Sequence, residues 1–152
     1  MKLITGSTAW GATMYPCPCC GYEVFAEPPG SYDICPICFW EDDIAQLAFP
    51  DLAGGANGCS LIEGQRNFAA FGACESRVKP HTRAPEASEA RNSAWRPLDT
   101  ARDRYLSWDR REDHEAWQAA KDTNSCMYYW LPEYWLAGRA PEPVRAPDRG
   151  RT

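Results

Sequence analysis

The sequence predicts a small α+β protein in which a cysteine-rich module precedes a helical, aromatic-rich C-terminal extension. Three observations support this prediction. Five of the eight cysteines lie between positions 17 and 38. Residues 1–65 contain one basic and eight acidic side chains, whereas residues 66–152 contain fifteen basic and thirteen acidic ones. Aromatic residues are densest in residues 126–138, CMYYWLPEYWLAG. The two halves therefore differ both in charge and in the residues available to build a core.

The cysteines of the first half stand in two pairs with the spacing of metal ligands. Cys17 and Cys20 form one C-x2-C pair, and Cys35 and Cys38 form the second after fourteen intervening residues. This spacing is typical of a closed four-thiolate structural zinc site built on two rubredoxin-like knuckles. The sequence therefore predicts a zinc-ribbon module with one structural zinc ion. Iron suits the same tetrahedral sulfur geometry and is the alternative metal.

The remaining cysteines have no such partner in the sequence. Cys19 lies inside the first pair, where we expect a small buried side chain, with a spare or alternative ligand as the other interpretation. Cys59, Cys74 and Cys126 are isolated and are expected to be packing residues. Disulfides are disfavoured because the N-terminus does not resemble a secretion signal, and a thioredoxin-like role would need a βαβ pattern that is not visible.

One strand and one helix of the first half have clear local signals. Residues 22–25 (YEVF) have strand-forming composition and lie between the two cysteine pairs. Ser60 begins Ser-Leu-Ile-Glu, in which Ser60 and Glu63 form a capping box. The apolar spacing that follows predicts a helix over 60–72, with Gly72 at its C-terminal end. We expect this helix to support the cysteine module.

The second half contains weaker helix signals. Thr100 followed by Asp103 resembles a second cap, so we expect a charged helix from there to about Lys121. Pro132 suits the first position of a short helix that Gly138 would end. The predicted organisation of the chain is therefore a module at 1–79, a linker at 80–97, a helical extension at 98–138 and a disordered tail at 139–152.

Three segments together resemble a known family. They are MYPCPCCGY (14–22), EPPGSYDICPICFWEDD (27–43) and GGANGCSLIEGQRNFAAFGACE (54–75). They are similar, in order and over about residues 14–80, to the bacterial cysteine-rich CPCC family. The resemblance implies a small, metal-binding, zinc-ribbon-like module, and it implies little about activity. Members of the family sometimes occur near toxin–immunity loci.

The residues that follow the second cysteine pair, Trp40, Glu41, Asp42 and Asp43, admit two interpretations. Carboxylates at the first turn of a helix complement its macrodipole, and this structural role is the one we favour. Alternatively, these four residues contact a partner. The enzyme alternative is a small metal-dependent enzyme in which the three carboxylates, with His81, act as acid, base or ligands.

The aromatic extension is also open to two interpretations. We expect its side chains to pack onto the first module, because exposed aromatic patches are costly unless used. The other interpretation makes Trp130, Tyr134 and Trp135 partner contacts. Arginine supplies thirteen of the sixteen basic residues, so nucleic-acid binding through the second half is a further alternative. The net charge of −5 argues against it.

The function expected from the sequence is noncatalytic: a zinc-stabilised, protein-binding module, with an immunity or antitoxin-like role as one form of it. We expect no catalytic residues and no cofactor besides the metal. No apolar run approaches the ~20 residues of a membrane helix, and the expected location is the cytoplasm.

Overall fold

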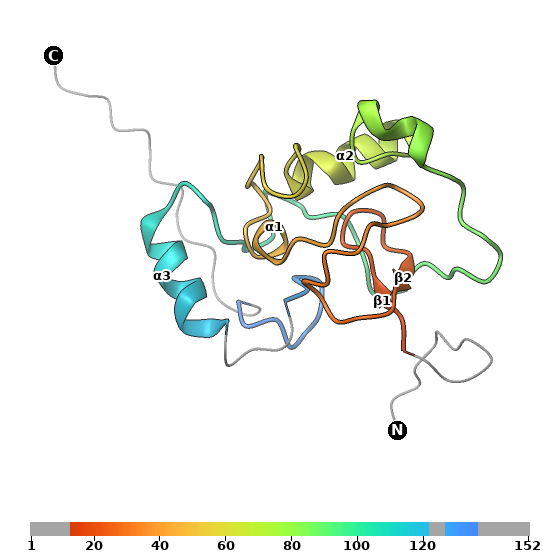
Figure 1. Ribbon diagram of the computed structural model, residues 1–152. Coiled ribbons are helices and arrows are strands. Elements are labelled where there is room, and N and C mark those ends of the chain that lie inside the picture. The colour runs from red at the N-terminus through yellow and green to blue at the C-terminus, as the bar shows by residue number, and fades with distance from the viewer. Residues whose placement is uncertain (1–12, 122–126, 137–152) are drawn as a thin grey trace, which may run out of the picture.

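The computed structural model describes residues 13–121 and 127–136 (Figure 1). Its helices and strands in these ranges are, in chain order, β1 (Tyr15–Pro16), β2 (Glu23–Phe25), α1 (Ile44–Ala48), α2 (Leu61–Phe71), the 3-10 helix η1 (Ser76–His81) and α3 (Arg111–Ala120). Long irregular segments connect them. In this part of the chain, every helix is too short or too polar to cross a membrane.

The two strands form an antiparallel hairpin around the first cysteine pair. Tyr15 pairs with Phe25 and Pro16 with Glu23, and the register shifts between Tyr15 and Pro16. The connection between the strands contains the first cysteine pair, so the hairpin holds these thiols at a tight turn. The predicted strand at 22–25 is confirmed, one residue shorter than its sequence signal.

Helix α2 begins and ends where its sequence signals predict. The Ser60 side chain accepts a hydrogen bond from the Glu63 N–H, and the Glu63 carboxylate accepts one from the Ser60 N–H. Gly72 ends the helix at φ +79°, and its N–H donates to the Phe68 carbonyl. This left-handed conformation costs glycine nothing. The helix thereby presents Leu61, which is completely buried, to the cysteine module.

Helix α3 docks on the end of α1 through an aromatic cluster. The Phe49 ring, completely buried at the C-cap of α1, lies 5.3 Å from the Trp108 ring, 5.0 Å from His114 and 5.6 Å from Trp117, between centroids. Asp51 adds polar contacts, since its carboxylate accepts from the Ser107 hydroxyl and the Trp108 N–H. Figure 1 shows α1 between α3 and the β1–β2 hairpin.

Residues 80–97, expected to be a linker, pack against the first cysteine pair. After η1 the segment is irregular, yet the Arg91 Nε donates to the Cys20 carbonyl at 2.9 Å. The Trp95 indole N–H donates to the Pro18 carbonyl, also at 2.9 Å. Instead of separating two units, these residues cover the cysteine turn.

The helix expected from Thr100 to about Lys121 begins later than predicted, since α3 starts at Arg111, eleven residues after Thr100. Residues 98–110 form turns and irregular structure. Asp103 does not complete a helix cap: its carboxylate binds the Arg96 guanidinium and accepts the Asp99 N–H. Hydrogen bonds from the Arg96 side chain and the Asp99 N–H to the Asp103 carboxylate thus replace those of a helix start.

The short helix expected at 132–138 is also not observed where the structure describes it. Residues 131–136 form turns. Isolated helices this short have little stability of their own, so burial of the aromatic side chains decides the backbone conformation. Gly138, Cys126 and the predicted disordered tail at 139–152 lie outside the described residues.

Candidate metal centre

The first cysteine turn is a knuckle closed by two backbone hydrogen bonds. The Cys17 N–H donates to the Tyr22 carbonyl at 2.9 Å, and the Gly21 N–H donates back to the Cys17 carbonyl at 2.7 Å. Gly21 has φ +83°, a left-handed conformation that side chains disfavour. Pro18 presets the turn between the two ligands. Gly21 therefore allows the chain to close the knuckle.

The second cysteine turn repeats this geometry with different residues. The Cys35 N–H donates to the Trp40 carbonyl at 2.8 Å, and the Phe39 N–H donates to the Cys35 carbonyl at 2.9 Å. Phe39 occupies the position of the glycine and has φ +69°. A left-handed phenylalanine is strained, so the closure of this knuckle outweighs a local conformational cost.

The two knuckles face each other and bring four sulfur atoms together. Cys17 Sγ lies 3.6 Å from Cys38 Sγ, and Cys20 Sγ lies 3.7 Å from Cys35 Sγ. All four sulfurs lie within 4.8 Å of one another. A tetrahedron with metal–sulfur bonds of about 2.3 Å has sulfur–sulfur edges of about 3.8 Å. The donor set therefore fits a tetrahedrally coordinated metal ion.

Burial makes this cluster an unfavourable place for uncompensated charge. All four ligand side chains have zero exposure. Burial raises the pKa of Cys17 and of Cys38 well above the ordinary thiol value. Hydrogen bonds from the other three thiols, Cys17 foremost, hold the pKa of Cys35 far below that value. Four buried thiolates would repel one another, and a bound cation would supply the charge that stabilises them.

Cys19 is completely buried but takes no place in the four-sulfur group. Its sulfur packs on α2 at Gly64, where an added Cβ would lie 3.2 Å from Cys19 Sγ and 3.3 Å from Trp40 Cζ3. A glycine in the middle of this helix therefore lets the knuckles approach its backbone. Cys19 acts here as a small core residue, in line with the interpretation favoured from sequence.

Sequence comparison agrees with this geometry. The cysteine-rich CPCC family matches residues 15–89, a range that contains both knuckles and α2. These residues belong to the cysteine-rich CPCC family. We call residues 15–89 the CPCC module. No curated protein matches the chain in sequence.

Two of the carboxylates after the second knuckle serve the CPCC module internally. The Asp43 side chain caps α1 by accepting the Ala45 N–H at 2.8 Å, and its other oxygen accepts the Ala56 N–H at 2.9 Å. Asp42 Oδ2 accepts from the N–H groups of Gly30 and Ser31. Asp43 therefore has a structural role at the start of a helix, as the sequence favoured, but as the N-cap of α1 and not as a residue of its first turn.

For Trp40, Asp42 and Asp43, burial contradicts the alternative interpretation as partner contacts. Trp40 is completely buried, Asp42 is 1% exposed and Asp43 is 6% exposed. Glu41 is half-buried and lines a cavity of about 40 Å³. His81 stacks on Phe39, with ring centroids 5.1 Å apart. The carboxylates weighed as an acid, base or ligand set therefore point to different surroundings and do not converge in this cavity.

The C-terminal aromatic residues pack largely into the core. Trp130 and Tyr134 are buried, which contradicts the alternative interpretation of them as partner contacts, whereas Trp135 is half-buried. The Tyr128 and Trp130 rings stack with centroids 4.5 Å apart, and the Tyr128 hydroxyl donates to the Pro16 carbonyl. The expectation that these aromatics pack on the first module is confirmed for the buried ones.

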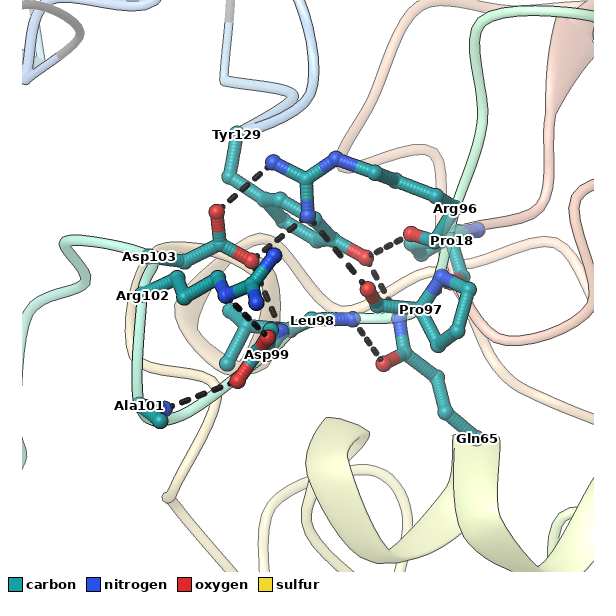
Figure 2. Close-up of polar contacts among 10 residues, drawn as sticks. All are labelled: Pro18, Gln65, Arg96, Pro97, Leu98, Asp99, Ala101, Arg102, Asp103 and Tyr129. Carbon is teal, nitrogen blue, oxygen red and sulfur yellow. Dashed lines mark hydrogen bonds and ion pairs between the residues drawn. The ribbon is translucent and has the colours of Figure 1, made fainter.

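Sequence analysis missed Gln65, which connects the CPCC module to the extension (Figure 2). The Gln65 Nε2 donates to the Pro18 carbonyl and to the Tyr129 hydroxyl oxygen, each at 2.9 Å, and its Oε1 accepts the Leu98 N–H. The Tyr129 hydroxyl donates in turn to the Arg96 carbonyl at 2.5 Å. A buried amide with three long-range partners has no local sequence signature, because those partners lie 33 to 64 residues away.

Proposed function

We propose that the chain is a noncatalytic protein-binding module stabilised by one structural zinc ion in a zinc-ribbon-like fold. The observation that carries the metal part is the closed set of four buried sulfurs at tetrahedral spacing. Cys17, Cys20, Cys35 and Cys38 would hold the ion. Four thiolates complete the coordination and leave no position for a substrate or water, which is the arrangement of structural sites.

The ion would supply folding free energy, because the regular structure of the CPCC module is small. Its sheet consists of strands of two and three residues. Small domains with little core need a disulfide or metal staple. Structural zinc contributes about 10–16 kcal/mol of apparent binding free energy at neutral pH, and this becomes folding free energy when the apo site is unfolded. Metal removal is therefore expected to unfold the module.

A matched pair of cysteine variants tests the metal site. Cys38→Ser removes a proposed ligand, whereas Cys19→Ser makes the same chemical change in a neighbouring buried thiol outside the group. We expect native mass spectra to show one zinc per chain in the native protein and in C19S, and loss of zinc with loss of far-UV CD signal in C38S. Iron in the native protein would refute zinc, and equal metal content in C19S and C38S would refute the ligand assignment.

The binding part of the proposal is supported by an exposed surface beside the second knuckle, where Ile34 pairs with Glu41. This surface consists of Tyr32, Asp33, Ile34 and Glu41. Tyr32 is 51% exposed and Ile34 is 48% exposed, which is unusual for large apolar side chains. Tyr32 is also held at φ +60°, a conformation that costs a non-glycine residue energy. Two carboxylates accompany these side chains, so the surface suits a partner segment that combines basic and apolar residues.

The arginines of the second half support a protein partner over nucleic acid. Many of them are engaged with carboxylates of the same chain. These pairs are Arg77–Glu75, Arg83–Glu89, Arg96–Asp103, Arg102–Asp99, Arg110–Asp113 and Arg111–Glu115. Nucleic-acid affinity depends on cations that are free to neutralise phosphates. An immunity or antitoxin-like role is one form of protein binding compatible with an acidic surface.

The binding proposal is tested with the chain isolated from its own host under native conditions. A co-purifying protein should be lost from the Tyr32→Ala/Ile34→Ala variant. It should be retained by Phe71→Ala, which removes another exposed apolar side chain from the end of α2. Zinc content checks the fold of both variants. Retention of the protein by the double variant would refute this surface as the binding site. Binding that weakens steeply as salt is raised and is lost on nuclease treatment would indicate nucleic acid as the bound molecule.

A further inference from the structure

Two cysteines outside the metal centre form a pair in space. Cys59 precedes α2 and Cys74 follows it, and both are buried, at 7% and 2% exposure. The Cys59 thiol donates to the Cys74 carbonyl at 3.2 Å, so the two cysteines are in direct contact. The sequence interpretation of these residues as isolated packing cysteines is therefore incomplete.

The backbone on both sides of this pair is fixed by hydrogen bonds. The Cys59 N–H donates to Glu75 Oε1 at 2.9 Å, and the Cys74 N–H donates to the Cys38 carbonyl at 2.9 Å. The Asn67 side chain donates to the Cys74 carbonyl at 2.8 Å. A disulfide requires two cysteines to be held within a narrow range of distances. Here hydrogen bonds of the fold hold the two cysteines together, and neither belongs to the four-sulfur group.

Cys74 also lines the cavity of about 40 Å³ described above. Asn57, Glu75 and Arg77 contribute to the same lining, and Arg77 is exposed, so the cavity reaches the surface. One water molecule needs about 10–15 Å³ of such volume. The cavity therefore admits a molecule of the size of water or hydrogen peroxide and excludes bulky disulfides such as oxidised glutathione.

We propose that Cys59 and Cys74 form an oxidation site for hydrogen peroxide, with Cys74 as the reacting thiol and Cys59 as the resolving thiol. The Cys74 thiolate attacks one peroxide oxygen, the O–O bond breaks, and Cys74 sulfenic acid and hydroxide form. The Cys59 thiol then attacks the sulfenic sulfur, and a disulfide and water form. Peroxide is reduced by two electrons and the two cysteines are oxidised to cystine.

The two sites differ in what protects their thiols. Metal coordination would occupy the electron pairs of the four ligands, and Cys19 is enclosed between α2 and Trp40. Cys74 has a small cavity beside it and a second thiol within reach, which is the arrangement of peroxide-sensitive cysteines. The proposal does not depend on the partner or on the identity of the bound metal.

The test is peptide mapping after exposure of the metal-loaded full chain to a few equivalents of hydrogen peroxide. Free thiols are alkylated, and the protein is then digested after glutamate under nonreducing conditions. Peptide 42–63 contains Cys59 as its sole cysteine, and peptide 64–75 contains Cys74 as its sole cysteine. We expect these two peptides to be cross-linked, with a mass lower by two hydrogen atoms than their sum.

Three variants make the result specific. Cys59→Ser should leave a sulfenic acid on peptide 64–75, which dimedone traps, and Cys74→Ser should abolish both products. Cys19→Ser should form the cross-link as the native chain does. Metal content and far-UV CD verify that each variant is folded. Absence of the cross-link, or oxidation confined to the cysteines of residues 1–41, would overturn the proposal.

Discussion

Replacement of Gln65 by alanine tests the connection between the CPCC module and the extension. The change leaves the buried Leu98 N–H without its hydrogen-bond acceptor. The Pro18 carbonyl retains its hydrogen bond from the Trp95 indole N–H, and the Tyr129 hydroxyl retains its hydrogen bond to the Arg96 carbonyl. One orphaned buried donor costs about 1–3 kcal/mol, and two lost hydrogen bonds cost about 0.5–1.5 kcal/mol each. We therefore expect unfolding free energy to fall by about 3 kcal/mol.

Thermal unfolding of the zinc-loaded chain measures this loss. For a chain of this size, about 3 kcal/mol corresponds to a Tm lower by roughly 6–12 °C. Arg66→Ala is the matched control, because Arg66 is the next residue of α2 and is exposed, so its Tm should change little. Tyr129→Phe should lower the Tm by less than Gln65→Ala, since it leaves the Leu98 N–H paired. Equal Tm values for the Gln65 and Arg66 variants would refute the reasoning.

Two further predictions concern single positions near the knuckles. The free energy of unfolding of Phe39→Gly should be about 1 kcal/mol higher than that of Phe39→Ala, because Phe39 is at φ +69°, which glycine adopts without strain. At Ile37, which lacks a positive φ, the alanine variant should be the more stable of the two. Urea titrations at fixed free zinc measure both pairs. A higher stability of Phe39→Ala would contradict the left-handed knuckle. Burial raises the pKa of Asp42 above 3.8, so its carboxyl contributes most to stability at acid pH and loses that contribution as pH rises through the raised pKa. The Tm of Asp42→Asn should therefore match or exceed the native Tm near neutral pH, and this difference in Tm should shrink on acidification. A Tm that is lower than the native value by the same amount at every pH would argue against a destabilising charge on the buried Asp42 carboxylate.

The four-cysteine cluster was predictable because its determinants are local. The C-x2-C spacing, the proline inside each pair and the glycine after the first pair specify a knuckle with few residues. The four ligands named from spacing are the four that converge. The capping box of α2 is equally local, and its helix begins and ends at the residues that these signals indicate.

The second half was poorly predicted because its signals are weak and its contacts are distant. Thr100 and Asp103 have the spacing of a cap, yet the Asp103 carboxylate binds the Arg96 guanidinium and the Asp99 N–H instead of a helix end. Burial of aromatic side chains prevented the helix expected at 132–138 within the residues described. Propensity is a weak prior that tertiary contacts override.

The sequence by itself determined the four cysteines that cluster, the family and the position of α2, since spacing and capping act over a few residues. The tertiary structure decided which polar and thiol groups meet. It placed Gln65 between two halves of the chain, buried Asp42 and Asp43 in the module, and brought Cys59 next to Cys74. Such pairings depend on how the irregular segments fold back over the knuckles, and no short pattern of residues encodes that path.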